Sequence, residues 1–186
     1  MTLTDLVGPV TDLLGSVSNP GFSGRAVEQV DVPWGAARKH RQSLLTEAGT
    51  PLRLKLPRGT FLAGGTVLAD DGTTIIVVRR PPEDAIVLDF AENTGPDAVR
   101  RALQLGYLLG NQHAPLDVTA QRLATPLYTS AEQAAATLAS LQLVARVEAV
   151  PLAAHGWSNT SADHHTGHQH AGNHQDEHTH HGHDRD

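Results

Sequence analysis

The sequence predicts an α+β protein, with a small all-β domain first, a ferredoxin-like βαββαβ domain second and a disordered histidine-rich tail last. Residues 52–80 combine period-two alternation with glycine-bearing turns, and residues 94–111 change to a helical period. Of the 12 histidines, 10 lie in the last 32 residues. We therefore expect four segments, namely an N-terminal extension, a β domain, a ferredoxin-like domain and the tail, at 1–20, 21–82, 83–152 and 153–186.

The first 20 residues carry apolar side chains at a helix-like spacing, which Asp5 and Asp12 interrupt. No Lys or Arg precedes the apolar positions, so we do not expect a secretion signal. We interpret the segment as a frayed or loosely docked extension, because disorder concentrates at chain termini. A partner-binding helix is the alternative.

The β domain is predicted from strand periods and turn residues. Leu52 to Leu56 alternate between apolar and charged side chains until Pro57 ends the run. After a Gly64-Gly65 turn, the run Thr66 to Ala69, the hairpin signal Asp70-Asp71-Gly72 and the β-branched run Thr73 to Arg80 predict two paired strands.

Several charged residues of this region have two interpretations. Adjacent Asp70 and Asp71 resemble a catalytic carboxylate pair, but before a glycine they are more typical of a turn. We interpret Arg79 and Arg80 as solvated charges at a strand end, and Pro81-Pro82 as the domain boundary.

The second domain begins with a predicted strand at residues 85–90 and a helix at 94–111. The apolar side chains expected to share one face of this helix are Ala98, Ala102, Leu105 and Leu109. Asn93 or Thr94 is expected to cap this helix, and Gly110 to close it in the left-handed conformation.

Two strands at residues 116–120 and 122–127 follow, then a helix at 130–141. Thr129 with Glu132 three residues later predicts a capping box for that second helix. A last strand at 143–150 completes the βαββαβ order.

Composition excludes several function classes. The net charge is −6, so we expect no nucleic-acid partner. No apolar run approaches the roughly 20 residues of a membrane span, and the absence of cysteine suits the cytoplasmic location that we expect. The metalloprotease, phosphate-loop, dinucleotide and nucleophile-elbow motifs are all missing, so we do not expect an enzyme.

The tail is predicted to bind divalent metal ions through its imidazoles. Imidazole suits Ni²⁺, Zn²⁺ and Cu²⁺, and the histidines are mixed irregularly with Asp, Gly, Asn and Gln, unlike an affinity tag. Unperturbed histidine titrates near pH ~6.5, so protons compete with metal below neutrality. The candidate ligands here are His155, His164, His165, His168, His170, His174, His178, His180, His181 and His183.

His113 stands apart from the tail, at the junction between the first helix and the next strand. Taken alone it is an ordinary exposed loop residue, because one imidazole binds a divalent ion weakly. A homodimer would bring the same residue from both subunits together at the two-fold axis.

Four pieces occur in a recognisable order: LPRG at residues 56–59, DDG at 70–72, YLLGNQHAP at 107–115 and the histidine-rich end. From about Gln29 onward this order resembles the UreE family of urease accessory proteins. The resemblance implies that the β domain is similar to peptide-binding domains and that the ferredoxin-like domain binds metal. It further implies a homodimer in which His113 of each subunit binds nickel across the axis, with His155 or tail histidines completing the shell. It also implies a cytoplasmic nickel chaperone that supplies the urease accessory GTPase and the apo-urease complex.

Two departures from the family pattern limit what the resemblance implies. Where some members carry further metal-binding histidines, this chain has Tyr128 to Ala131, and Gln112 replaces a common arginine beside His113. A storage or buffering protein for Ni²⁺, Zn²⁺ or Cu²⁺, in which the tail is the whole function, is the main alternative. A metallohydrolase is a second alternative.

Overall fold

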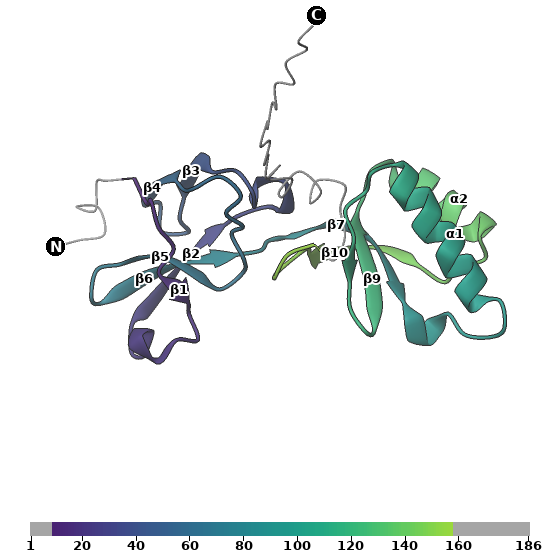
Figure 1. Cartoon of the computed structure of the whole chain (residues 1–186), viewed down its shortest axis with the longest axis horizontal. Helices are drawn as coiled ribbons and strands as arrows, with labels where there is room; N and C mark the ends of the chain where they lie inside the picture. Colours follow the sequence, from purple (N-terminus) through teal and green to yellow (C-terminus); the bar gives the residue numbers. More distant parts are fainter. Residues whose placement is uncertain (1–8, 158–186) are drawn as a thin grey trace, which may run out of the picture.

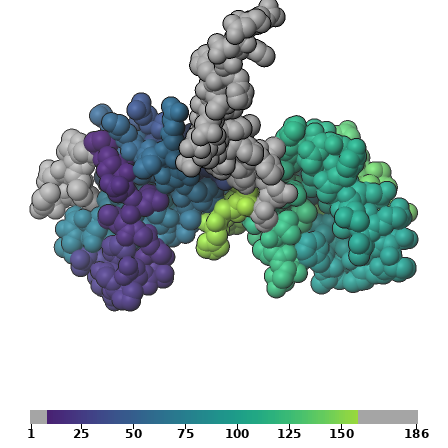
Figure 2. Space-filling model, viewed as in Figure 1, coloured from purple at the N-terminus to yellow at the C-terminus, as the bar shows by residue number. Residues whose placement is uncertain are grey.

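The protein is described by a computed structural model over residues 9–157, which form two domains (Figure 1). The first is rich in strands, and the second combines two helices with an antiparallel sheet. The predicted α+β class is therefore confirmed. In Figure 2 the two domains are separate lobes, the first in purple to blue and the second in teal to green.

The first domain is built on a four-stranded sheet in the order β1-β5-β6-β2. Its strands are β1 (Gly15–Ser16), β2 (Ala26–Asp31), β5 (Thr66–Asp70) and β6 (Thr74–Arg79). β5 and β6 form the predicted hairpin, in which Asp70 and Asp71 accept hydrogen bonds from the amides of Gly72 and Thr73. The interpretation of both aspartates as turn formers is confirmed.

A two-stranded antiparallel ribbon of β3 (Arg41–Leu45) and β4 (Pro51–Lys55) covers this sheet. Leu52, Leu54 and Leu56 point inward as the alternation predicts, while the charged side chains between them are exposed. Their neighbours in the apolar core come from both layers: Val30, Val32, Leu62, Leu68, Ile76 and Val78. β2 and β3 escaped prediction because charged and polar residues dilute their alternation.

Residues 9–20 belong to the first domain. The Val10 amide donates to the Arg53 carbonyl, the Lys55 amide donates to the Val10 carbonyl, and β1 pairs with β5. The alternative of a partner-binding helix is wrong for residues 9–19, which contain no helix. Two short 3₁₀ helices, η2 (Pro20–Phe22) and η3 (Trp34–Ala36), connect strands of this domain.

The second domain is ferredoxin-like, with its antiparallel sheet in the order β10-β7-β9-β8. The strands are β7 (Pro82–Asp89), β8 (Asp117–Val118), β9 (Arg122–Pro126) and β10 (Arg146–Pro151). The helices α1 (Ala98–Asn111) and α2 (Ala131–Ser140) lie on the face of the sheet away from the first domain (Figure 1). They bury an apolar core that includes Ile86, Leu88, Leu105, Leu109 and Leu138.

Both helices begin later than predicted, and neither is capped by the side chain that the sequence suggested. Asp97 stands at the N-cap of α1 without a side-chain hydrogen bond to it. Asn93, an expected cap, instead bonds the Asp89 and Val144 carbonyls and the Val144 amide, and so ties the entry of α1 to the segment before β10. The Ser130 hydroxyl, rather than Thr129, caps α2 by accepting from the Gln133 amide.

Arg80 corrects another prediction, since it is buried rather than solvated. Its guanidinium donates to the carbonyls of Val32 and Leu62 and lies 5.1 Å from the Phe61 ring centroid. Burial lowers the pKa of Arg80. Arg79, one residue earlier, is exposed and pairs with Asp31, as a strand-end charge should.

The segment after β10 returns to the first domain. The Gly64 amide donates to the Ala154 carbonyl at 2.7 Å, and the rings of Trp34 and Trp157 meet edge to face at 5.7 Å between centroids. Leu152 and Ala153 are fully buried. The chain therefore stays packed through Trp157, two residues beyond the change of composition at His155, and the predicted disordered part after it lies outside the described residues.

A short 3₁₀ helix, η4 (Phe90–Glu92), directly follows β7. β7 itself starts at Pro82, where Pro82 pairs with Pro151 of β10. Pro82 is thus a strand residue, and the exact domain limits stay predictions. No helix within residues 9–157 has the length and apolar character needed to cross a membrane.

Candidate metal site

His113 lies exposed at the C-terminal end of α1, with a left-handed φ of 52°. Its amide donates to the Gly110 carbonyl, and the Ala114 amide donates to the Leu109 carbonyl. These two bonds form a Schellman motif, which closes a helix around a left-handed residue. The prediction that Gly110 takes this conformation is wrong, because α1 continues through Gly110 and turns three residues later.

The motif fixes the backbone beneath the imidazole. Most residues avoid the left-handed region, although histidine enters it more readily than branched residues. Gln142 closes α2 in the same way with a φ of 54°, so the conformation alone is a helix-closing device. At His113 it also presents an exposed nitrogen ligand from an ordered position.

His155 lies in a bend after β10 and is exposed as well. Its neighbours are held: the Ala153 amide donates to Asp117 Oδ2 at 3.0 Å, and the Gly156 amide donates to the Ala153 carbonyl. Gly156 has a φ of 123°, which suits glycine. His155 is thus on an anchored turn.

The bond between Asp117 and Ala153 links the two histidine-bearing segments. Asp117 is four residues after His113 in the chain, and Ala153 is two residues before His155. The loop after α1 and the segment after β10 are therefore tied together at one end of the second domain.

One copy of residues 9–157 does not gather a complete metal site. No group of three or more His, Cys, Asp or Glu side chains in this part of the chain is arranged to hold a metal ion. The two available donors are imidazoles, which fit Ni²⁺, Zn²⁺ and Cu²⁺, and a four-coordinate ion would need further ligands. The nine histidines from His164 to His183 lie outside the described residues.

An apolar stripe on α1 escaped the sequence interpretation. Val99, Leu103 and Tyr107 are 70%, 69% and 74% exposed, and their spacing of four residues puts them along one side of the helix. Large side chains of this kind normally face a core, and an exposed row of them marks a contact surface. The row runs along the helix that ends two residues before His113.

The sequence contained a signal for this stripe. The predicted buried face of the helix used Ala98, Ala102, Leu105 and Leu109, which left Val99, Leu103 and Tyr107 unassigned. A helix with apolar residues on two faces indicates two contacts, one of them outside the domain core.

Comparison with known proteins matches both domains to one family. Residues 10–80 match the family model described as the UreE urease accessory protein, N-terminal domain, and residues 89–184 match the C-terminal domain of the same protein. Together the two models cover most of the chain, and they meet near the structural junction before β7.

Individual relatives agree with the family models. The chain is 34% identical over 95 residues to "Urease accessory protein UreE" of Verminephrobacter eiseniae, covering 50% of this chain and 55% of the relative. It is 32% identical over 108 residues to the protein of the same name from Synechococcus sp., which covers 56% of this chain and 67% of that relative. It is 34% identical over 95 residues to the protein of that name from Methylibium petroleiphilum, which covers 50% of this chain and 42% of that relative. The aligned stretch spans about half the length of the curated relatives that it matches.

Two domain models in the expected order, a confirmed ferredoxin-like second domain and the motif around His113 all agree. The chain belongs to the UreE family of urease accessory proteins.

Proposed function

We propose that this urease accessory protein is a cytoplasmic nickel chaperone that binds Ni²⁺ at a homodimer interface and delivers it to the urease maturation machinery. The observation that carries the proposal is the position of His113, an exposed imidazole on a fixed helix end directly after an exposed apolar stripe. It is not an enzyme in this proposal, since delivery requires binding and release and no bond chemistry.

The dimer contact uses α1. A two-fold axis makes each subunit present the same patch to the other, so packing along Val99, Leu103 and Tyr107 buries both copies of the stripe. His113 from both subunits then approaches the axis at the helix ends. Two imidazoles at one point supply half of a four-coordinate shell.

The remaining ligands come from His155 and the tail. His155 is on the turn tied to Asp117, and the histidines of the tail follow it in the same chain. A ligand tethered by a short flexible segment acts at roughly millimolar effective concentration. The tail therefore captures Ni²⁺, Zn²⁺ or Cu²⁺, and the interface holds one ion for transfer to the urease accessory GTPase and the apo-urease complex.

A nickel titration with paired variants tests the site. His113→Asn tolerates the left-handed conformation and removes the imidazole, and His40→Asn makes the same change in the first domain. We expect calorimetry to show that His113→Asn abolishes the tightest class, one ion per two chains, while His40→Asn leaves it unchanged. Normal activation of apo-urease by His113→Asn under limiting nickel would overturn the assignment.

Removal of residues 158–186 separates a chaperone from a storage protein. A chain that ends at Trp157 keeps His113, His155 and the Trp34 contact. In a chaperone it retains the one tight ion and loses capacity, whereas in a storage or buffering protein it loses all binding. A metallohydrolase would instead show turnover by the metal-loaded protein without a partner.

A further inference from the structure

Positive charge is concentrated in one short part of the first domain. Residues 38–58 contain six of the 14 Lys and Arg residues of the chain, against the single carboxylate of Glu47, although the whole chain has a net charge of −6. Three of these cations, Arg41, Arg53 and Lys55, lie on β3 and β4 with exposed side chains. Such a field attracts an anionic partner.

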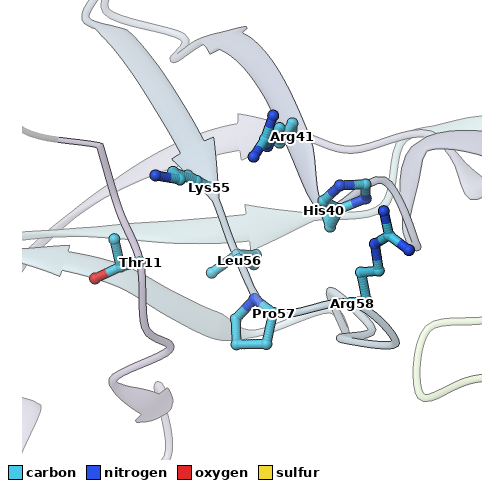
Figure 3. Close-up of a pocket in the computed structure, with 7 residues that line it drawn as sticks. All are labelled: Thr11, His40, Arg41, Lys55, Leu56, Pro57 and Arg58. Atoms are coloured by element: carbon cyan, nitrogen blue, oxygen red, sulfur yellow. The ribbon is translucent and has the colours of Figure 1, made fainter.

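A groove of about 450 Å³ opens at one end of this ribbon. Thr11, His40, Arg41, Lys55 and the turn 56–58 line it, and we call it the basic groove. Figure 3 shows the nitrogen-bearing side chains of His40, Arg41, Lys55 and Arg58 around it, with Thr11 on the N-terminal segment. A second hollow of about 500 Å³ adjoins it and shares Arg41 and Lys55.

The cations of the basic groove lack carboxylate partners within residues 9–157. No ion pair in this part of the chain involves Arg41, Lys55 or Arg58, and all three are exposed. Two other exposed arginines do have carboxylate partners: Arg79 bonds Asp31 and Arg146 bonds Asp89. Asp12 directly follows Thr11 of the groove, and its carboxylate accepts a hydrogen bond from the Thr11 hydroxyl.

The chain also contains an anionic segment that fits. Residues 158–186, the acidic tail, carry five carboxylates against Arg185, for a net charge of −4 with histidine counted as neutral. The carboxylates are Asp163, Asp176, Glu177, Asp184 and Asp186.

The acidic tail leaves the described chain close to the basic groove. Trp157 packs on Trp34 of η3, and His40 of the groove is six residues after Trp34. Six residues span at most about 21 Å. The tail has 29 residues, which could reach at most about 100 Å, so its length is sufficient to cover that distance.

We propose that the acidic tail of this chain docks in the basic groove of its own first domain. Carboxylates of residues 176–186 lie against Arg41, Lys55 and Arg58, in contacts that are individually weak, exposed and salt-sensitive. Tethering makes them effective, because the anchor at Trp157 keeps the tail concentration at the groove near the millimolar range. A separate acidic partner would lack this advantage.

If the tail binds metal ions, as the proposed function requires, metal binding should release the tail from the groove. Two divalent ions bound by tail imidazoles cancel the tail's net charge of −4 and remove its attraction to the groove. The docked form is then the empty form, and metal loading releases the tail.

Paramagnetic broadening tests the docking in the full chain, which contains no cysteine. A nitroxide on Thr179→Cys lies between the acidic clusters of the tail, and the amide signals of Arg41, Lys55 and Arg58 report its approach. We expect these signals to lose more than half of their intensity at 50 mM NaCl and to regain it at 500 mM NaCl. Mixing spin-labelled with isotope-labelled chains separates docking within one chain from docking between chains.

A matched pair of variants tests the charges. Lys55→Glu with Arg58→Glu reverses two groove cations and should abolish the broadening. Arg100→Glu with Arg122→Glu makes the same change of charge in the second domain and should preserve it. Absence of broadening at 50 mM NaCl, or broadening that survives the groove reversal, overturns the proposal. So does a groove that is unbroadened by the tail but binds an added hexaglutamate peptide, which indicates an acidic partner from another protein.

Titration with zinc, which is diamagnetic, tests docking of the tail and metal binding by the tail separately. If the tail binds zinc by calorimetry and the broadening disappears, the release step is supported; if the broadening persists, that step is wrong. If the tail docks but binds no metal, the docking stands and the metal-capture role fails.

Discussion

The first domain leaves positive charge on its surface, whereas the second leaves apolar side chains there. β3 and β4 carry Arg41 and Lys55, which form no ion pair within residues 9–157, beside a groove. α1 exposes Leu103 and Tyr107 over more than two-thirds of their surface. An exposed apolar surface is stabilised when a partner packs closely against it, whereas exposed charge attracts an oppositely charged partner that can remain mobile or in solution. The second domain is thus suited to a lasting dimer contact, and the first to a reversible electrostatic one.

The interiors of the two domains also differ in polarity. The first domain buries an arginine, Arg80, whose carbonyl partners come from Val32 and Leu62. The ferredoxin-like domain has an apolar core of strands and helices, and Asn93 forms an exposed polar contact at its edge. Single substitutions should therefore act on folding in the first domain and on assembly in the second.

The largest effect on folding is expected from Arg80→Ala. It leaves buried carbonyls of Val32 and Leu62 without donors, at a cost of about 3 kcal/mol of unfolding free energy. Arg79→Ala, the control, removes an exposed pair and should cost less than about 1 kcal/mol. Equal urea midpoints for the two variants would contradict the role of the buried guanidinium.

The next effect concerns assembly. Leu103→Glu puts a charge in the apolar stripe and should weaken the proposed dimer at least 100-fold, or about 2.7 kcal/mol. Leu45→Glu is a matched control, since Leu45 is 65% exposed but lies on β3 of the first domain. Sedimentation at several concentrations gives both dissociation constants, and a dimer unaffected by Leu103→Glu would rule out α1 as the contact.

A substitution at the junction between the domains should have an effect of intermediate size on stability. Trp157→Ala removes the edge-to-face contact with Trp34 and should lower stability by about 2 kcal/mol, less than for a fully buried tryptophan. It should also speed hydrogen exchange of the Gly64 amide, which the Ala154 carbonyl holds. Unchanged exchange at Gly64 would mean that Trp157 does not secure this segment.

The smallest effect is the pH dependence of an exposed ion pair. The hydrogen bond from Arg79 holds the pKa of Asp31 below its usual value. The pair therefore stabilises the fold at pH values above the unfolded pKa near ~3.9, and this contribution is lost as pH falls through the lower folded pKa.

Asp31→Asn should accordingly cost less than about 1 kcal/mol at pH 7, and the difference from the unsubstituted protein should shrink at pH 3. Asp12→Asn, which changes a carboxylate that accepts a hydrogen bond from neighbouring Thr11, is the control substitution. A difference that grows on acidification would have the wrong sign for this pair.

Much of the fold was predictable because its signals are local. The alternation at Leu52 to Leu56, the Asp70-Asp71-Gly72 turn and the helical period after residue 94 each follow from a few neighbouring residues. Cap positions were less predictable. Asn93 and Thr129 both have the right chemistry for an N-cap, yet Asn93 binds the distant Val144 and Ser130 caps α2 instead of Thr129.

The candidate site was predictable in part. His113 was found from its motif, but its left-handed backbone was expected at Gly110. The exposed stripe beside it was missed, because a periodic pattern does not state which of two apolar faces the domain will cover.

By itself the sequence determined the order of elements, the imidazole-rich end and the family, since periodicity, composition and motifs are properties of short segments. Tertiary structure alone decided that Arg80 is buried while Arg79 is solvated, that the chain stays packed to Trp157, and that Arg41, Lys55 and Arg58 share one groove. The physical reason is that burial and pairing depend on partners far away in sequence. Arg80, for example, meets carbonyls 48 and 18 residues away, a distance that no local pattern reports.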